Sequence, residues 1–130
     1  MILDTTFIID LMNNLPEAIA KLKQMQKQKE SLFVSSVSLF ELWSGIAQSD
    51  HPDKEKQRVK AVLASQLVLD LTKESAEEAG MINGTLWKNG TPIDPEDSMI
   101  AGIAKQYEEK VLTRNIRHFS KVKDLMIERY

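Results

Sequence analysis

MILDTTFIID, residues 1–10, is an apolar opening that Asp4 interrupts after three residues and that ends on Asp10. Residues 1–4 predict a short buried strand, and the residues after them predict a helix. A buried carboxylate is costly unless it is paired or holds a metal ion. Asp4, at the end of the strand, is therefore a candidate site residue. Asp10, inside the helix, is expected to be a structural acid that caps or pairs with a neighbour.

After this opening, further apolar runs predict strands, and apolar residues at helical spacing fill the intervals between them. Thr5 or Thr6 is expected to cap the first helix, and Ser36 the helix after the second strand. The strand runs are residues 31–36, 66–71 and 110–113, with residues 126–130 as a candidate last strand. The helix after Ser36 is expected to bury one stripe, formed by Leu39, Trp43, Ile46 and Ala47.

Strands that alternate with helices in this way predict an α/β domain with a mainly parallel sheet. A chain of 130 residues fits a single domain, so residues 1–130 are expected to form one. In such sheets ligands bind beyond the carboxyl ends of the strands.

Composition excludes several classes of site. The chain has no cysteine and two histidines, so neither a disulfide framework nor a Cys-based or His-rich metal site is expected. Any metal must be held by oxygen, which favours Mg²⁺ or Mn²⁺ over zinc. The net charge of -2 gives no global attraction to nucleic acid. The opening lacks a basic leader, and no stretch reaches the roughly 20 apolar residues of a membrane span, so a cytoplasmic protein without membrane contact is expected.

Four side chains with oxygen atoms lie where predicted strands and helices meet. Asp4 ends the first strand, Glu41 lies in the helix after the second, Asp97 opens the helix before the fourth, and Asn115 follows the fourth. In a normally wound sheet they can converge at one edge. Three like charges would then repel one another and raise at least one pKa, and a hard divalent cation would remove this conflict. An acidic cluster of this kind is typical of metal-assisted phosphoryl chemistry.

The sequence also resembles a known family, the PIN-domain nucleases. LDTTFIIDL (3–11), SVSLFELWSG (36–45), TPIDPEDSMIAGIA (91–104) and VLTRNIRHF (111–119) resemble its four motifs, in order and at matching intervals. The short length and the TRNIRHF ending are most similar to the VapC-type toxins of toxin–antitoxin pairs.

The resemblance implies a three-layer α/β/α fold and a ribonuclease dependent on Mg²⁺ or Mn²⁺. By motif match, Asp4, Glu41 and Asp97 are metal ligands. Asn115 stands where many members have a fourth acid, and His118 where relatives often have Asp. The resemblance further implies an RNA substrate, an antitoxin partner and a homodimer. Thr6 and Thr113 match positions that support the site.

Other interpretations remain open at this stage. The basic residues after the fourth strand can hold RNA phosphates or form an ordinary solvated loop; they are Arg114, Arg117, Lys121 and Lys123. Trp43 and Trp87 are expected in the core or at an interface. A haloacid-dehalogenase-like phosphatase would need a second aspartate two residues after Asp4, where Thr6 stands, and a phosphoacceptor receiver would need adjacent early acids. A non-catalytic PIN-fold binding module is the remaining alternative, acting through protein or RNA contacts.

Overall fold

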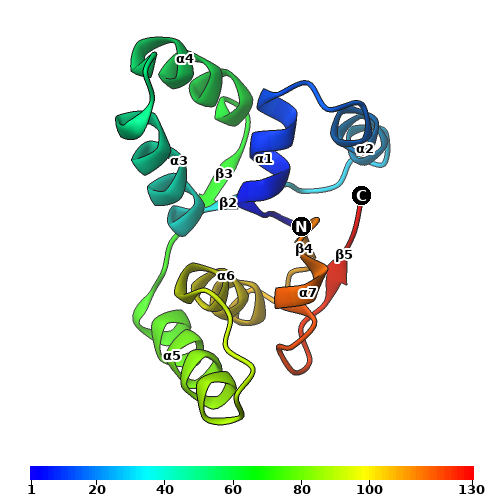
Figure 1. Ribbon diagram of the computed structural model, residues 1–130. Helices are drawn as coiled ribbons and strands as arrows, with labels where there is room; N and C mark the ends of the chain where they lie inside the picture. The colour runs from blue at the N-terminus through cyan, green and yellow to red at the C-terminus, as the bar shows by residue number, and fades with distance from the viewer.

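The computed structural model describes all residues 1–130, and the elements follow the predicted alternation of strands and helices (Figure 1). In chain order they are β1 (Ile2–Leu3), α1 (Thr5–Met12), α2 (Pro16–Lys27), β2 (Phe33–Ser35), α3 (Ser36–Gln48), α4 (Pro52–Leu63), β3 (Leu67–Leu69), α5 (Lys73–Lys88), α6 (Pro95–Gln106), β4 (Val111–Leu112), α7 (Ile116–Phe119) and β5 (Ile127–Glu128).

The five strands form one sheet in the order β3-β2-β1-β4-β5, and every pair is parallel. The first strand is therefore central, with Ile2 opposite both Phe33 and Val111. Crossover helices cover both faces, as parallel pairing requires. The predicted three-layer α/β/α fold with a mainly parallel sheet is confirmed.

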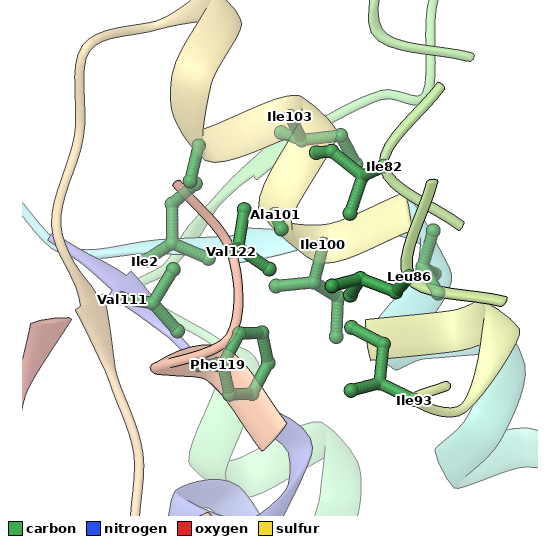
Figure 2. Close-up of a cluster of buried hydrophobic side chains, with 12 residues drawn as sticks. Ile2, Ile82, Leu86, Ile93, Ile100, Ala101, Ile103, Val111, Phe119 and Val122 are labelled. Carbon is green, nitrogen blue, oxygen red and sulfur yellow. The ribbon is translucent and has the colours of Figure 1, made fainter. Parts of the chain in front are cut away.

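The pleat of these short strands divides the core in two, because neighbouring residues of a strand point to opposite faces. Ile2 and Val111 pack with α5, α6 and Phe119 on one face (Figure 2). Leu3 and Leu112 pack on the other face against the helices from α1 to α4. Both faces of β1 and β4 are thus fully used for packing, and polar side chains are confined to the strand ends.

Local sequence explains where the helices begin. Pro16, Pro52 and Pro95 each occupy the first turn of a helix, where the missing N–H costs nothing. Helix α5 has a capping box, in which Thr72 accepts from the backbone N–H of Ser75 and the Ser75 side chain accepts from the N–H of Thr72.

Two expectations about α3 were wrong. Ser35, not Ser36, caps α3, and its Oγ accepts from the Ser38 N–H at 3.0 Å. Ser36 is the first helical residue and instead accepts from the N–H of Leu71. The buried face of α3 also differs from the expected stripe: it consists of Val37, Ser38, Leu42 and Ile46, whereas Trp43 and Ala47 are exposed.

The two tryptophans do not belong to the core. Trp43 is 40% exposed, with the Lys56 ammonium 5.4 Å from its ring centre, and Trp87 is 75% exposed. No helix of the structure combines the length and the hydropathy that crossing a bilayer requires.

Candidate active site

The predicted site residues gather at the carboxyl edge of the sheet, around the point where the strand order reverses. From β1 the chain order continues through β2 on one side, while β4 adds on the other. Such a reversal leaves a crevice beyond the strand ends, because the connecting helices leave toward opposite faces. Asp4 directly follows β1, and Thr113 directly follows β4.

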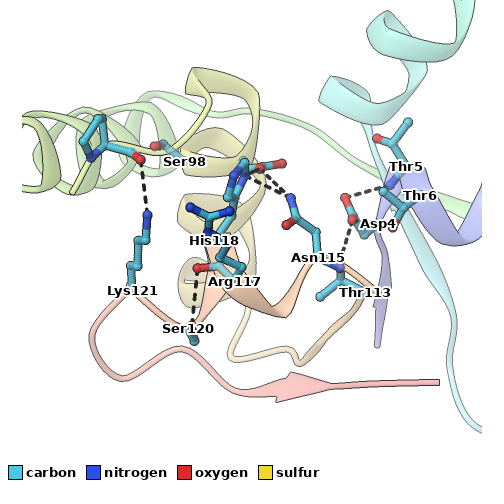
Figure 3. A network of polar contacts seen from close by, with 12 residues as sticks. Asp4, Thr5, Thr6, Ser98, Thr113, Asn115, Arg117, His118, Ser120 and Lys121 are labelled. Atoms are coloured by element: carbon cyan, nitrogen blue, oxygen red, sulfur yellow. Dashed lines mark hydrogen bonds and ion pairs between the residues drawn. The ribbon is translucent and has the colours of Figure 1, made fainter.

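Asp4 is fixed by three donors, and it is also the N-cap of α1, so the expectation that Thr5 or Thr6 caps this helix was wrong. Its Oδ1 accepts from the Thr5 N–H at 2.8 Å. Its Oδ2 accepts from the hydroxyls of Thr6 at 2.8 Å and Thr113 at 2.7 Å (Figure 3). The side chain is 2% exposed, so these bonds replace water and hold the carboxylate in one orientation. Thr6 and Thr113 thus contact the group that they were predicted to support.

Glu41 is joined to Asp4 through Thr5. The Thr5 hydroxyl lies 2.7 Å from Glu41 Oε1 and 2.8 Å from the Ser38 hydroxyl. Burial is the largest influence on Glu41 and raises its pKa, whereas the Thr5 hydrogen bond lowers it. The charges of Asp4 and Asp97 raise the pKa of Glu41 further, as expected for carboxylates on neighbouring elements.

Asp97 lies in the first turn of α6, and its Oδ2 is the centre of a second group of polar side chains. His118 Nδ1 lies 2.7 Å from this oxygen, and Asn115 Nδ2 donates to it at 3.3 Å. Asn115 Nδ2 and His118 Nδ1 are 2.9 Å apart. Burial raises the pKa of Asp97, the contact with His118 lowers it, and the charge of Asp4 raises it again. The net shift is upward, so a lone histidine does not compensate the burial of this acid.

The structure adds side chains that sequence reasoning did not place in the site. The potential metal ligands whose atoms lie within 4.8 Å of one another are Asp94, Asp97 and His118, a group that does not include Asp4 or Glu41. From the sequence alone, His118 has no expected role beyond standing where relatives often have Asp. His118 lies three residues after Asn115, the N-cap of α7, and this spacing brings the two side chains to the same side of the turn. The spacing could have indicated that His118 belongs to the site.

The basic residues after β4 differ in their surroundings. Arg114 forms an ion pair with Asp10, at 3.1 Å between Nη1 and Oδ2. Lys121 Nζ lies 3.5 Å from the Pro92 carbonyl oxygen, while Arg117 and Lys123 are exposed. Asp10 therefore pairs as predicted, although its partner belongs to the loop next to the site rather than to its own helix.

The raised pKa values of Glu41 and Asp97 predict how stability depends on pH. In the unfolded chain both acids lose their protons at the ordinary value, whereas the folded state keeps them to higher pH. Between these values the folded state binds more protons, so the free energy of unfolding should fall as pH rises through this window. Thermal unfolding in chelator over a pH series measures this. A double variant, Glu41→Gln with Asp97→Asn, should flatten the dependence, and an unchanged slope in that variant would contradict the assignment.

Comparisons with known proteins agree with the fold and give the family. The family model described as PIN domain matches residues 1–125. The chain therefore belongs to the PIN-domain family. Within it, the chain is 32% identical to a tRNA(fMet)-specific endonuclease VapC of Salmonella typhimurium over 126 residues, which are 97% of this chain and 94% of that protein.

Solved structures give the same result. DNA-bound VapBC from Salmonella typhimurium aligns with a TM-score of 0.88 at 32% identity, covering 98% of this chain and 96% of that one. VapBC2 from Rickettsia felis, bound to a promoter DNA fragment, aligns with a TM-score of 0.90, covering 99% and 97%. At 22% identity, this second similarity concerns the fold alone.

Proposed function

We propose that the chain, as a single PIN domain over residues 1–130, is a metal-dependent endoribonuclease and the toxin of a toxin–antitoxin pair. The observation that carries the proposal is the polar network at the strand-order reversal, where Thr5 links Asp4 to Glu41 and α6 begins with Asp97 in its first turn. The full-length similarity to a VapC endonuclease supports RNA as the substrate.

We propose Mg²⁺ or Mn²⁺ as the cofactor, held by Asp4, Glu41 and Asp97. The residues present fit such an ion. Asp97 is buried and Glu41 is half-buried, both carry raised pKa values, and their ligand atoms are oxygens, which hard cations prefer. When bound, a divalent cation lowers the pKa of a coordinated water and offsets negative charge on the phosphate that is attacked.

The side chains of the protein have separate tasks in this proposal. The hydroxyls of Thr6 and Thr113 keep the Asp4 carboxylate oriented, so no rearrangement is needed when substrate arrives. Asn115 and His118 do the same for Asp97, and Asn115 offers one neutral oxygen to the site. In this proposal a water molecule attacks the phosphodiester directly, without a covalent intermediate.

Partners follow from the relatives and stay proposals for this chain. The solved Salmonella structure is a VapBC assembly, which supports an antitoxin as a partner. We further propose that the protein acts as a homodimer in the cytoplasm, with Arg114, Arg117 and Lys121 contacting RNA phosphates. Local basic residues matter here because the chain as a whole is acidic, with a net charge of -2.

Removal of the metal tests the proposed function. Purified protein is mixed with structured and with single-stranded RNA, first with Mg²⁺ or Mn²⁺ and then with excess chelator. We expect cleavage with the metal, loss of cleavage with chelator and recovery when metal is restored. Cleavage that persists in chelator contradicts metal dependence. Binding without cleavage under every condition favours the alternative, a non-catalytic module with a PIN fold.

A further inference from the structure

A second buried carboxylate, outside the acidic site, joins the end of the chain to the site loop. Asp10 on α1 is 6% exposed, and two groups distant in sequence share its Oδ2. The Tyr130 hydroxyl donates to this oxygen at 2.6 Å, and Arg114 Nη1 lies 3.1 Å from it. In Figure 1 the C-terminal residues run from β5 toward the part of the molecule where α1 and α2 lie. We call these three residues, Asp10, Arg114 and Tyr130, the arginine clamp.

The tyrosine end of the clamp packs against the core. The Tyr130 ring meets the fully buried Phe7 ring edge-on, with centroids 4.7 Å apart and planes at 75°. Such edge-to-face pairs fix ring orientation. Burial and the Asp10 carboxylate both raise the pKa of Tyr130, so the phenol keeps its proton and remains a donor at neutral pH. Asp10 is thereby held by a neutral donor on one side and by a cation on the other.

The arginine end of the clamp faces solvent. Its side chain is 59% exposed, against 8% for Asp10, and it makes no other ion pair. An exposed ion pair contributes little to stability, in the range of about 0–1 kcal/mol, so stability alone is a weak reason to bury an acid here. A guanidinium carries five N–H donors in a fixed fork, and the one nitrogen that Asp10 engages leaves the others free to bind a second anion.

The position of Arg114 in the chain indicates which anion its free N–H groups would bind. Its neighbour Thr113 donates to Asp4, and its other neighbour Asn115 donates to Asp97, so Arg114 is part of the loop that joins the two halves of the site. A group that Arg114 binds would therefore lie near the loop that contacts the proposed metal ligands. Guanidinium binds phosphate through paired N–H donors, and this geometry requires a fixed orientation.

We propose that Arg114 binds a backbone phosphate of the RNA next to the cleaved bond, and that Asp10 and Tyr130 are positioning residues that orient it. The proposal rests on the proposed ribonuclease function and adds two residues to it. The competing explanation is that the clamp only fastens the end of the chain to α1. The two explanations differ in whether Asp10 and Tyr130 affect RNA binding through Arg114.

A double-mutant cycle separates these explanations. We would measure binding of a labelled single-stranded RNA in chelator, over a series of salt concentrations, for Tyr130→Phe, Arg114→Ala and the double variant. Arg114→Ala should weaken binding about tenfold and reduce the slope of log K against log salt by about 0.7, the value for one lost phosphate contact on a single strand. Tyr130→Phe keeps the ring and should weaken binding about threefold, with the slope unchanged, since it leaves every charge in place.

The double variant is decisive. If Tyr130 acts through Arg114, its effect disappears when Arg114 is already alanine. An equal loss from Tyr130→Phe in both backgrounds, or no loss in either, overturns the proposal. Tyr107→Phe is the matched control, because Tyr107 is a half-exposed tyrosine at the end of α6, on the opposite edge of the sheet.

A further variant and the activity assay remove two remaining ambiguities. Arg114→Lys retains the charge but not the fork, so it should keep the salt slope and still lose affinity.

If the wild-type protein cleaves RNA in metal and Arg114→Ala does so with unchanged KM, this inference fails while the proposed function stands. If the wild-type protein neither binds nor cleaves RNA, the proposed function fails and this inference fails with it.

Discussion

Asp97→Asn is expected to reduce RNA cleavage by about 10²–10³-fold or more while leaving the protein folded and at least as stable. Asparagine keeps the shape of the side chain but removes the charge on which both the proposed metal and the ordered His118 depend. The same change removes an ionised group whose burial is costly, as the raised pKa of Asp97 indicates. Activity and stability should therefore move apart. The measurements are cleavage rate in Mg²⁺ and thermal unfolding in chelator.

Two further variants make this prediction specific. Asp50→Asn changes an exposed aspartate in the turn after α3, outside the site, and should leave cleavage unchanged. Asp94→Asn tests the alternative group of ligands, since Asp94 lies with Asp97 and His118 within 4.8 Å. Loss of activity in Asp94→Asn but not in Asp4→Asn would move the metal from the proposed ligands to that group. Full activity in Asp97→Asn would contradict both arrangements.

The acids of this site could be predicted from sequence because each lies at a junction of a strand and a helix. Asp4 directly follows a short apolar strand, and Asp97 lies in the first turn of α6, which begins at Pro95. Parallel pairing then brings these junctions to one edge without further information. The direction of the pKa shifts also followed from charge alone, although burial proves to be the larger cause.

What could not be predicted depends on single-residue register or on long separations in sequence. Ser35 and Ser36 are both good helix caps, so composition does not decide between them. The arginine clamp joins residues separated by 104 and 120 positions. Asp10 follows no pattern that points to either partner, and only the folded chain shows that this acid belongs beside the site.

Gly102→Ala is expected to lower the free energy of unfolding by about 1–3 kcal/mol, although alanine is the better helix former. A Cβ at this position would lie 2.5 Å from the Ser75 backbone oxygen and 2.9 Å from Ala79 Cβ. Because the nearest atom is backbone, a side-chain rotation cannot relieve the clash, and α5 and α6 must move apart. Denaturant unfolding measures the change in stability.

Gly84→Ala is the matched control for this prediction, with an effect of opposite sign. Gly84 is exposed on α5, and a Cβ there would meet nothing within 4 Å, so alanine should stabilise the protein by about 0.5–1 kcal/mol. The contrast also bears on function, because the helix that Gly102→Ala displaces is the one that carries Asp97. Under conditions where Gly102→Ala remains folded, we expect cleavage to fall roughly ten- to a hundredfold, while Gly84→Ala keeps full activity. Equal stability changes in the two variants would show that α5 and α6 do not pack as closely as described, and full activity in a destabilised Gly102→Ala would show that Asp97 tolerates displacement of its helix.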